Sequence, residues 1–301
     1  MKIILAGGSG FIGGALLNRL LKLGHQVTLL TRNPSKVKLH PFLTLQKWDG
    51  RNSDDWFACL ENSDAVINLS GESIVARRWT RNQKEKIIRS RVESTQVIIQ
   101  AIQQVKVKPK VLVNASAVGY YGNVPTGIVT EQSFRGSGFL SDTCVEWEST
   151  AQKVQDCGVR LVSIRIGVVL GKDGGALSKM LLPFKLFIGG PVGSGRQGFP
   201  WVHRDDVMGV ILLALQNSQV SGPINVVGPE LVNLKEFCTV LGQVIHRPSW
   251  MRIPAFVLKF LLGEMSSLLL DGQHIVPEKL QKLGYQFKYA TVSDALKEIL
   301  N

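Results

Sequence analysis

Residues 2–14 read KIILAGGSGFIGG, and this stretch decides the expected fold. The apolar run at its start predicts a short buried strand, and the helical spacing from Phe11 to about Leu23 predicts a helix. Between these two elements the glycines recur every third residue, at Gly7, Gly10 and Gly13. A strand, a glycine-rich turn and a helix in this order are typical of a dinucleotide-binding unit.

Each glycine of such a turn has its own physical task. The first permits the tight turn, the second lets the backbone approach a pyrophosphate, and the third lets the helix pack closely on the strand. The N–H groups at the helix N-terminus then face the phosphates. A tight turn without a ligand is the alternative. A signal peptide is rejected, because the glycines interrupt the apolar run and no cleavage site follows. The cofactor contacts expected in the turn are Gly7, Ser9, Gly10, Phe11, Ile12 and Gly13.

The end of the second expected strand, residues 26–31, indicates which dinucleotide is bound. An acidic residue about 20 positions after the glycines would bind the ribose 2′-hydroxyl of NAD. Residues 31–36 read TRNPSK and contain no acid. Arg32, with Lys36 as a second cation, can instead meet a 2′-phosphate, which favours NADP(H). The alternative is that Arg32 is a solvated cation at the strand end.

Strands and helices alternate through the first half of the chain. Further strands are expected at residues 43–48, 65–69, 111–116 and 159–165, and helices at 53–60 (capped by Ser53), 80–104 and 140–156. This alternation predicts an α/β fold with a doubly wound parallel (Rossmann) sheet. Ligands bind at the carboxyl ends of such strands, where the small residues Ser70 and Gly71 would let the cofactor pass close.

The helix at 80–104 opens in a basic segment and has an apolar stripe at Ile88, Val92, Thr95, Ile99 and Ile102. Arg91 borders that stripe, so it is expected to point inward at an anion of the cofactor or substrate. The other cations of the segment read as a solvated face.

The strand at 111–116 is followed by AVGYYG at residues 117–122. Ser116 and one of the tyrosines, Tyr120 or Tyr121, are expected to face the nicotinamide end of the pocket. They are candidates for polarising a carbonyl and delivering a proton. The alternative is that both tyrosines pack the pocket wall.

The second half is richer in loops. Asp205 or Asp206 is expected to cap a helix to residue 216, and residues 224–227 to form a further strand. Asn233 and Glu236 have the spacing of a capping box for a helix to about residue 245. Short helices are expected at 255–262, 277–283 and 292–300. We expect residues 1–170 with 203–228 to form the Rossmann domain, and residues 171–202 with 229–301 to form a smaller, mainly helical C-terminal substrate lobe.

The composition of the 301 residues is that of a folded protein, with 45% hydrophobic and 19% charged residues. No apolar run reaches the roughly 20 residues of a membrane span. The four cysteines and five histidines lack metal-ligand spacing, so no metal site is expected. The cysteines are expected to be free thiols in a reducing compartment. The net charge of +12 favours anionic partners. No nucleic-acid-binding motif is present, however, so the chain is not expected to bind nucleic acid. A cytoplasmic location is expected, because the first strand begins at residue 2.

Beyond these local patterns, the chain resembles the extended or atypical short-chain dehydrogenase/reductase superfamily, and more closely its epimerase-like family with a DUF1731-type C-terminal domain. The similarity covers nearly the whole chain. The matching pieces, besides the glycine turn, are LTR at 30–32, NLSGE at 68–72, SRV at 90–92, AVGYYG at 117–122, WE at 147–148, RIGVVLG at 165–171, GSGRQ at 193–197, RP at 247–248, PAF at 254–256, LGEM at 262–265 and GYQF at 284–287.

This resemblance implies NADP(H) as the cofactor and assigns its contacts. Thr31 and Arg32 would bind the 2′-phosphate, and Leu69 and Ser70 would lie along the ribose. Arg91 would lie on the polar side of the cofactor, Val168 near the nicotinamide, and Lys86 at a position that can also line the site.

The chain departs from the superfamily at the catalytic pair. Active members use Tyr-x-x-x-Lys, and the spacing back from Glu148 and Arg165 puts Phe139 and Thr143 at these positions. Phenylalanine cannot exchange a proton and threonine carries no charge, so the usual mechanism is in doubt. Three functions stay open: a reductase of an unknown small substrate, a catalytically silent NADP(H)-binding regulator with a protein partner (some relatives carry a cell-division-inhibitor label), and a nucleotide-sugar epimerase, which is the least favoured.

Overall fold

The computed structural model describes residues 1–52 and 56–301, apart from the side chain of Lys36. Its centre is a parallel sheet of seven strands in the order β3-β2-β1-β4-β5-β7-β10. The strands are β1 (Lys2–Ala6), β2 (Gln26–Thr31), β3 (Leu43–Lys47), β4 (Ala65–Asn68), β5 (Val111–Ala117), β7 (Arg160–Ile166) and β10 (Gly222–Val226). The strand order reverses between β1 and β4, which confirms the doubly wound Rossmann arrangement expected from the sequence.

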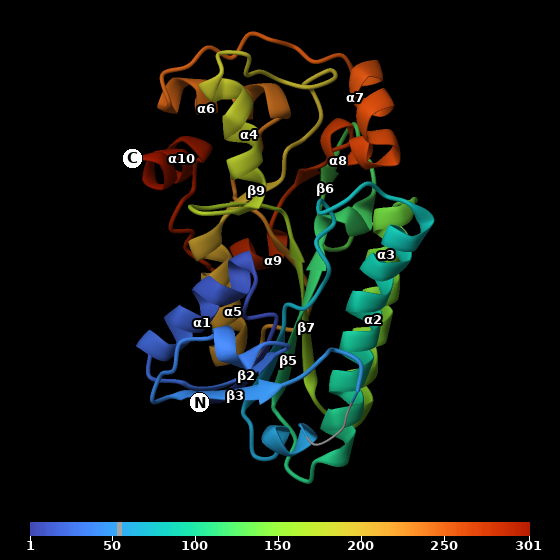
Figure 1. Ribbon diagram of the computed structural model, residues 1–301, viewed down its shortest axis with the longest axis vertical. Helices are drawn as coiled ribbons and strands as arrows, with labels where there is room; N and C mark the ends of the chain where they lie inside the picture. The colour runs from blue at the N-terminus through green and yellow to red at the C-terminus, as the bar shows by residue number, and fades with distance from the viewer. Residues whose placement is uncertain (53–55) are drawn as a thin grey trace.

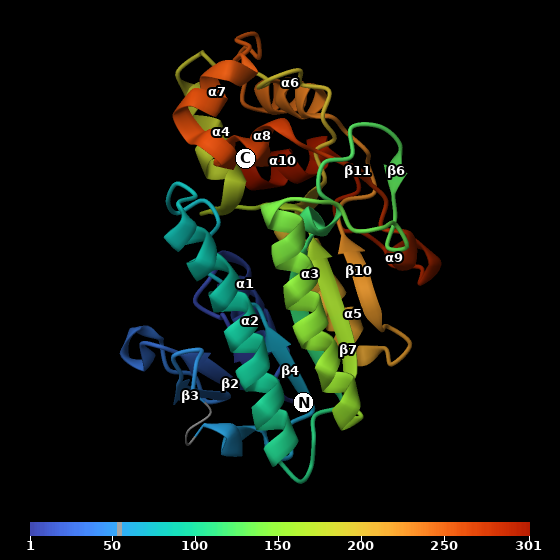
Figure 2. The same ribbon diagram turned by 90° about the vertical axis from the view of Figure 1, so that its right-hand side faces the viewer.

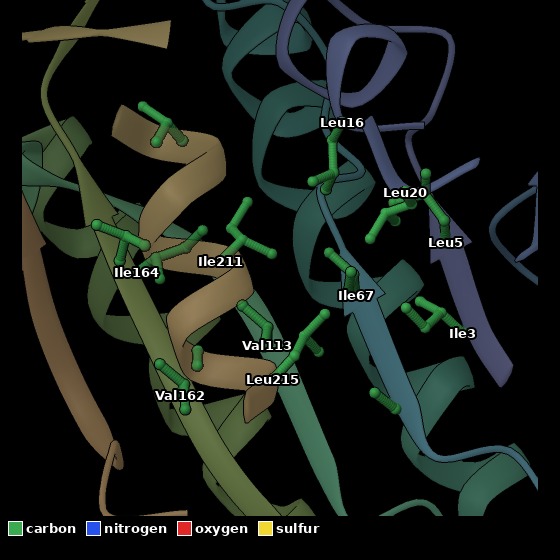
Figure 3. Close-up of a cluster of buried hydrophobic side chains, with 14 of the residues drawn as sticks. Ile3, Leu5, Leu16, Leu20, Ile67, Val113, Val162, Ile164, Ile211 and Leu215 are labelled. Atoms are coloured by element: carbon green, nitrogen blue, oxygen red, sulfur yellow. The ribbon is translucent and has the colours of Figure 1, made fainter. Parts of the chain in front are cut away.

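Two helices cover each face of the sheet (Figures 1 and 2). On one face lie α1 (Phe11–Lys22) and α5 (Arg204–Gln216), and on the other lie α2 (Arg81–Gln104) and α3 (Phe139–Gln152). Figure 3 shows the core on the first face, where Leu16 and Leu20 of α1 and Ile211 and Leu215 of α5 pack on strand residues such as Val113. The second face has a separate cluster between the sheet and α2.

The C-terminal part forms a helical lobe above the carboxyl ends of the strands, with a hydrophobic core of its own (Figure 1). Phe184, Phe237 and Leu296, from three different helices, are all buried in that core. The lobe helices are α4 (Gly175–Lys185), α6 (Leu234–Val244), α7 (Ala255–Leu262), α8 (Ser267–Leu270) and α10 (Val292–Leu300). Helix α9 (Glu278–Lys282) instead lies beside β10, and its Leu280 is buried in the core of the sheet.

Two short strand pairs join the halves, and the sequence did not predict them. They are β8 (Val168–Leu170) with β9 (Trp201–His203), and β6 (Ile128–Val129) with β11 (His274–Ile275). Strands of two or three residues carry no readable periodicity. Helix α4 was also missed, because its segment reads as part of a glycine-rich loop.

Several element boundaries differ from expectation. The expectation that Asp205 or Asp206 caps α5 is wrong: the N-cap is His203, whose Nδ1 accepts a hydrogen bond from the Asp205 backbone N–H at 3.1 Å. Helix α3 ends at Gln152, and a 3₁₀ turn continues to Cys157. The expected cap at Ser53 lies outside the described residues, and a 3₁₀ turn covers Phe57–Leu60.

The buried stripe of α2 is also rotated from the expected one. Ile88 and Val92 are only half-buried, whereas Ile87 and Ile98 are fully buried. Thr95, Ile99 and Ile102 are buried as expected.

Candidate functional site: a dinucleotide crevice with an altered catalytic end

The glycine turn at the end of β1 is as tight as its sequence predicts. Gly7 has φ +81°, and a β-carbon there would lie 2.5 Å from the carbonyl carbon of Leu69, at the end of β4. A β-carbon on Gly13 would lie 2.2 Å from the carbonyl oxygen of Gly7. The Gly10 N–H donates to that same oxygen at 3.1 Å, and Gly10 is the N-cap of α1. The first and third glycines thus allow contacts that no other residue could make.

In folds of this kind a dinucleotide binds in a crevice at the carboxyl ends of the strands where the strand order reverses, which here are β1 and β4. Leu69 and Ser70 form its second wall, both half-buried. A buried network fixes this wall: the Asn68 side chain donates to Asn114 Oδ1 at 2.8 Å and to Thr95 Oγ1 at 3.0 Å. The Asn68 Oδ1 atom accepts from the Ser70 N–H. Such a crevice at a topological switch point is the usual dinucleotide site of this fold.

Arg91 of α2 contacts the segment that follows β4. Its Nη1 donates to the carbonyl oxygens of Glu72 and Ile87, each at 3.0 Å. Its guanidinium is so close to Gly71 that a β-carbon there would lie 3.1 Å from Cζ. Burial lowers the pKa of Arg91. Within residues 1–52 and 56–301 no carboxylate lies within 4 Å of it, so its charge is suited to an anionic ligand.

The residues expected to select the cofactor, Thr31 and Arg32, lie at the end of β2. Thr31 is buried, and its Oγ1 accepts from the Asn33 N–H at 3.3 Å. Arg32 is exposed and makes no ion pair with any described residue. The side chain of Lys36, the second cation expected there, lies outside the described part.

Phe11, the first residue of α1, joins the turn to the start of the C-terminal lobe. The Phe11 ring fills the space that side chains on three glycines would occupy. A β-carbon added to Gly171, Gly174 or Gly175 would lie 2.8–3.0 Å from the ring. The Arg204 guanidinium lies 4.8 Å from the ring centroid, and its buried Nε has no hydrogen-bond partner in the described structure. No motif along the chain indicates this contact.

The remaining residues expected at the cofactor lie as follows. Ser9 and Gly10 are exposed in the turn, and Ile12 packs on the core of the sheet. Val168, the first residue of β8, is half-buried directly after β7. Lys86 is exposed near the start of α2, more than one helical turn before Arg91.

At the far end of the crevice, a buried ion pair organises Ser116 and Tyr121. Arg165 of β7 and Glu148 of α3 are 3% and 6% exposed and form two hydrogen bonds of 2.8 Å. Ser116 donates to Glu148 Oε1 at 2.6 Å. The Tyr121 hydroxyl donates to Asn225 Oδ1 at 2.6 Å and accepts from Arg165 at 2.9 Å. Burial raises the pKa of Tyr121 to about 12, so its proton is held firmly.

Tyr120 differs from its neighbour. It is half-buried, and its hydroxyl makes no hydrogen bond to a described residue. Its ring lies flat against the ion pair, with the Arg165 Cζ 3.5 Å from the ring centroid. Sequence reasoning missed the role of Arg165 and Glu148. The available signal was an arginine at the end of a strand expected to be buried, since such a charge needs a buried partner.

Phe139 and Thr143, the residues expected at the positions of the usual Tyr-x-x-x-Lys pair, are both packed against neighbouring groups. The Phe139 ring lies edge-on to Trp79 at 4.9 Å, and Lys84 Nζ lies 5.2 Å from its centroid. Thr143 is buried, and its hydroxyl donates to the Phe139 carbonyl oxygen at 2.6 Å. Neither residue can move a proton to a ligand.

In the described residues, no group of three or more His, Cys, Asp or Glu side chains could hold a metal ion. None of the helices traced in residues 1–52 and 56–301 is both long and apolar enough to cross a membrane.

Comparison with known proteins gives a consistent result. The pattern of the NAD dependent epimerase/dehydratase family matches residues 3–228, and the domain of unknown function DUF1731 matches residues 253–299. The Arabidopsis thaliana protein called epimerase family protein SDR39U1 homolog, chloroplastic, is 43% identical, over 100% of this chain and 87% of the relative. The human epimerase family protein SDR39U1 (isoform2), crystallised with NADPH, is 36% identical with a TM-score of 0.88, over 99% of both chains. UDP-glucuronic acid 4-epimerase from Bacillus cereus has a TM-score of 0.81 at 18% identity, which is a likeness of fold alone.

Proposed function

Since the chain belongs to the NAD dependent epimerase/dehydratase family, we propose that it binds NADP(H) and reduces a small carbonyl compound or activated alkene. The observation that carries the cofactor choice is the pair of arginines along the crevice. Arg32 stands at the end of β2, Arg91 donates to two backbone carbonyl oxygens, and neither makes an ion pair with a described residue. The human relative crystallised with NADPH supports the same choice.

The residues of the crevice fit the cofactor. Gly7 and Gly13 leave no room for side chains, so the phosphates can approach the N-terminus of α1. Thr31 and Arg32 would hold the 2′-phosphate, Leu69, Ser70 and Gly71 the adjacent ribose, and Arg91 the polar side. Val168 would lie near the nicotinamide. When bound, NADPH would supply the hydride.

The chain itself must then hold the substrate oxygen and give it a proton. Of the three candidate groups, Tyr120 is the best suited, because its hydroxyl is free among the described residues. Ser116 is committed to Glu148 and Tyr121 to Asn225, and Tyr121 has a strongly raised pKa. We therefore assign proton delivery to Tyr120. Ser116 and Tyr121 are positioning residues, which act through the Arg165–Glu148 pair.

A catalytically silent NADP(H)-binding regulator is the second candidate, and a specific observation favours it. Phe139 and Thr143 replace the usual proton-transfer pair and are packed against neighbouring groups. The same replacement counts most strongly against nucleotide-sugar epimerisation, since that reaction needs the missing tyrosine.

The cofactor assignment is tested by calorimetric titration of the cofactor-stripped protein with NADPH and NADH. Arg32→Ala should weaken NADPH binding by about 1.5–3 kcal/mol, the range for hydrogen bonds to a charged group, and should leave NADH unchanged. Arg19→Ala, which removes an exposed arginine at the opposite end of α1, is the matched control. Equal affinity of both nucleotides for the parent protein would remove the basis of the assignment.

The choice between reductase and silent regulator is tested by NADPH oxidation with a panel of carbonyl compounds and activated alkenes. Saturable oxidation that falls about 100-fold or more in Tyr120→Phe, the scale of general acid catalysis, would support the reductase and its proton donor. Tyr121→Phe serves as the comparison and should lower stability more than turnover. No oxidation with any compound, despite tight NADPH binding, would favour the silent regulator.

A further inference from the structure

A cluster of exposed apolar side chains lies on the helical lobe. Trp250, Phe256 and Phe260 are 66%, 73% and 84% exposed. A single exposed apolar side chain is ordinary on a protein surface, whereas a cluster of them marks an interaction site. We call this cluster the distal patch, and it consists of Leu186, Phe187, Trp250, Phe256, Phe260 and Leu261.

Hydrogen bonds hold the two segments of the distal patch side by side. The indole N–H of Trp250 donates to the Phe187 carbonyl oxygen at 3.0 Å, and the backbone N–H of Trp250 donates to the Gly189 carbonyl oxygen at 3.1 Å. The Gly193 N–H donates to the Ile253 carbonyl oxygen at 2.9 Å, shortly before α7 begins. Figure 1 shows the chain between α6 and α7 running along the top edge of the lobe, beside the loop that follows α4. The distal patch is therefore one edge of the lobe.

Helix α7 holds two of the aromatic rings at this edge. Phe256 and Phe260 are four residues apart, so they lie on the same face of the helix, with Lys259 beside them. Leu258 is buried and attaches the helix to the lobe. The packing of α7 thus fixes both phenylalanine rings in contact with solvent.

The charge around the distal patch is positive. Residues 174–204 and 237–263, which include the whole patch, contain no aspartate or glutamate. The exposed cations beside the apolar side chains are Lys185, Arg247, Arg252 and Lys259. None of these four cations forms an ion pair with a described residue. The guanidinium of Arg247 lies 4.6 Å from the ring centroid of Phe187, so cations and apolar groups share one surface.

The acids that follow α7 leave this charge unbalanced. Glu264 pairs with Lys84 of α2. Burial raises the pKa of Asp271 and the charge of Lys259 lowers it, but the two side chains form no ion pair within 4 Å. The distal patch is consequently apolar and cationic at the same time.

The surface of an anionic lipid bilayer matches this combination. Aromatic side chains lie at the level of the lipid headgroups, and nearby lysines and arginines are attracted to anionic headgroups. A second copy of the chain matches less well. A two-fold interface would place the four cations of one patch opposite the same four cations of the other, and like charges oppose association.

We propose that the distal patch docks the folded chain on the surface of an anionic membrane. Trp250, Phe256 and Phe260 enter the headgroup region, and Lys185 and Lys259 contact anionic headgroups. The chain lies on the membrane and does not cross it. This docking is independent of the cofactor and of the proposed reaction.

The test is co-sedimentation of the full chain with vesicles of phosphatidylcholine alone and of phosphatidylcholine mixed with phosphatidylserine. The chain should sediment with the mixed vesicles, and less so at high salt, because salt screens the headgroup charge. Phe256→Ser combined with Phe260→Ser should lower the partition coefficient about tenfold or more, since two apolar side chains no longer leave water. Phe134→Ser is the matched control, because Phe134 is 95% exposed and lies outside the patch.

A second pair of variants tests the charge. Lys185→Gln combined with Lys259→Gln should lower partitioning to the mixed vesicles about tenfold, and should leave partitioning to phosphatidylcholine alone unchanged. Arg19→Gln combined with Lys22→Gln removes two exposed cations of α1 and is the matched control. Both controls should partition as the parent protein does. Thermal unfolding of every variant should match that of the parent protein, because the replaced side chains are exposed.

Three results would overturn the proposal. The first is a folded parent protein that does not sediment with the mixed vesicles at low salt. The second is an equal loss of partitioning in the patch variants and in their controls, which would reduce the effect to general surface charge or hydrophobicity. The third is self-association in sedimentation equilibrium that the phenylalanine variant abolishes while vesicle binding stays unchanged. That result would assign the distal patch to a second copy of the chain.

Discussion

Gly13 shows how a single residue sets the shape of the crevice. A β-carbon there would lie 2.2 Å from the Gly7 carbonyl oxygen, which is backbone and cannot move without shifting the end of β1. Gly14, the next residue, differs sharply, since its β-carbon would meet the Gly8 carbonyl oxygen at 3.5 Å, an ordinary contact distance.

Gly13→Ala is therefore expected to lower the free energy of unfolding by about 1–3 kcal/mol, as overpacking does, and to weaken NADPH binding. Gly14→Ala is the control and should be neutral or stabilising by up to about 1 kcal/mol, because alanine favours a helix. Urea unfolding and NADPH titration of both proteins measure the difference. Normal cofactor affinity in Gly13→Ala would mean that the turn does not limit the crevice.

At the scale of an element, α6 illustrates a helix start fixed by local chemistry. Asn233 Oδ1 accepts from the Glu236 N–H at 2.9 Å, and Glu236 Oε2 accepts from the Asn233 N–H at 2.8 Å. This is the capping box that the spacing of the two residues predicts. Phe237 and Leu241 of the same helix are fully buried in the core of the lobe.

Asn233→Ala should cost about 1 kcal/mol of stability, the usual loss for an N-cap. Asn233→Asp keeps the acceptor and should stay within a few tenths of the parent protein. The quantity to measure is the free energy of unfolding in urea. Equal loss in both variants would show that the amide contributes through something other than the cap.

At the scale of the whole molecule, His203 connects the sheet domain to the last helix. It ends β9, caps α5 through Nδ1, and its Nε2 lies 3.0 Å from Glu298 Oε2 of α10. The C-terminal loop is held similarly, since Asp206 accepts the backbone N–H groups of Lys288 and Tyr289. We propose that residues 1–170 with 203–228 form one domain and that 171–202 with 229–301 form the lobe, with these contacts as the joint.

Burial lowers the pKa of His203 below its ordinary 6.5, in spite of the carboxylates of Asp205, Asp206 and Glu298. The folded chain thus favours the neutral ring. Below pH 6.5 the ring binds a proton in the unfolded chain, whereas in the folded chain it stays neutral until the pH nears its lowered pKa. The contribution of His203 is complete above pH 6.5 and is lost as the pH falls toward its lowered value.

The free energy of unfolding should therefore fall between pH 7 and about pH 5.5 more steeply in the parent protein than in His203→Asn. Asparagine retains an N-cap acceptor but does not titrate. His25, whose pKa is also lowered by burial, contributes equally to both proteins and cancels in the comparison. Parallel pH profiles would mean that His203 does not titrate in this window.

The sequence by itself determined the alternation of strands and helices, the tight glycine turn and the capping box of α6. These features depend on residues a few positions apart, where periodicity and backbone sterics act alone. Contacts between distant residues were decided only by the tertiary structure. Tyr121 meets Asn225 across 104 positions, and His203 meets Glu298 of α10 across 95. No spacing along the chain records such contacts, because they form only when the sheet and the lobe pack together.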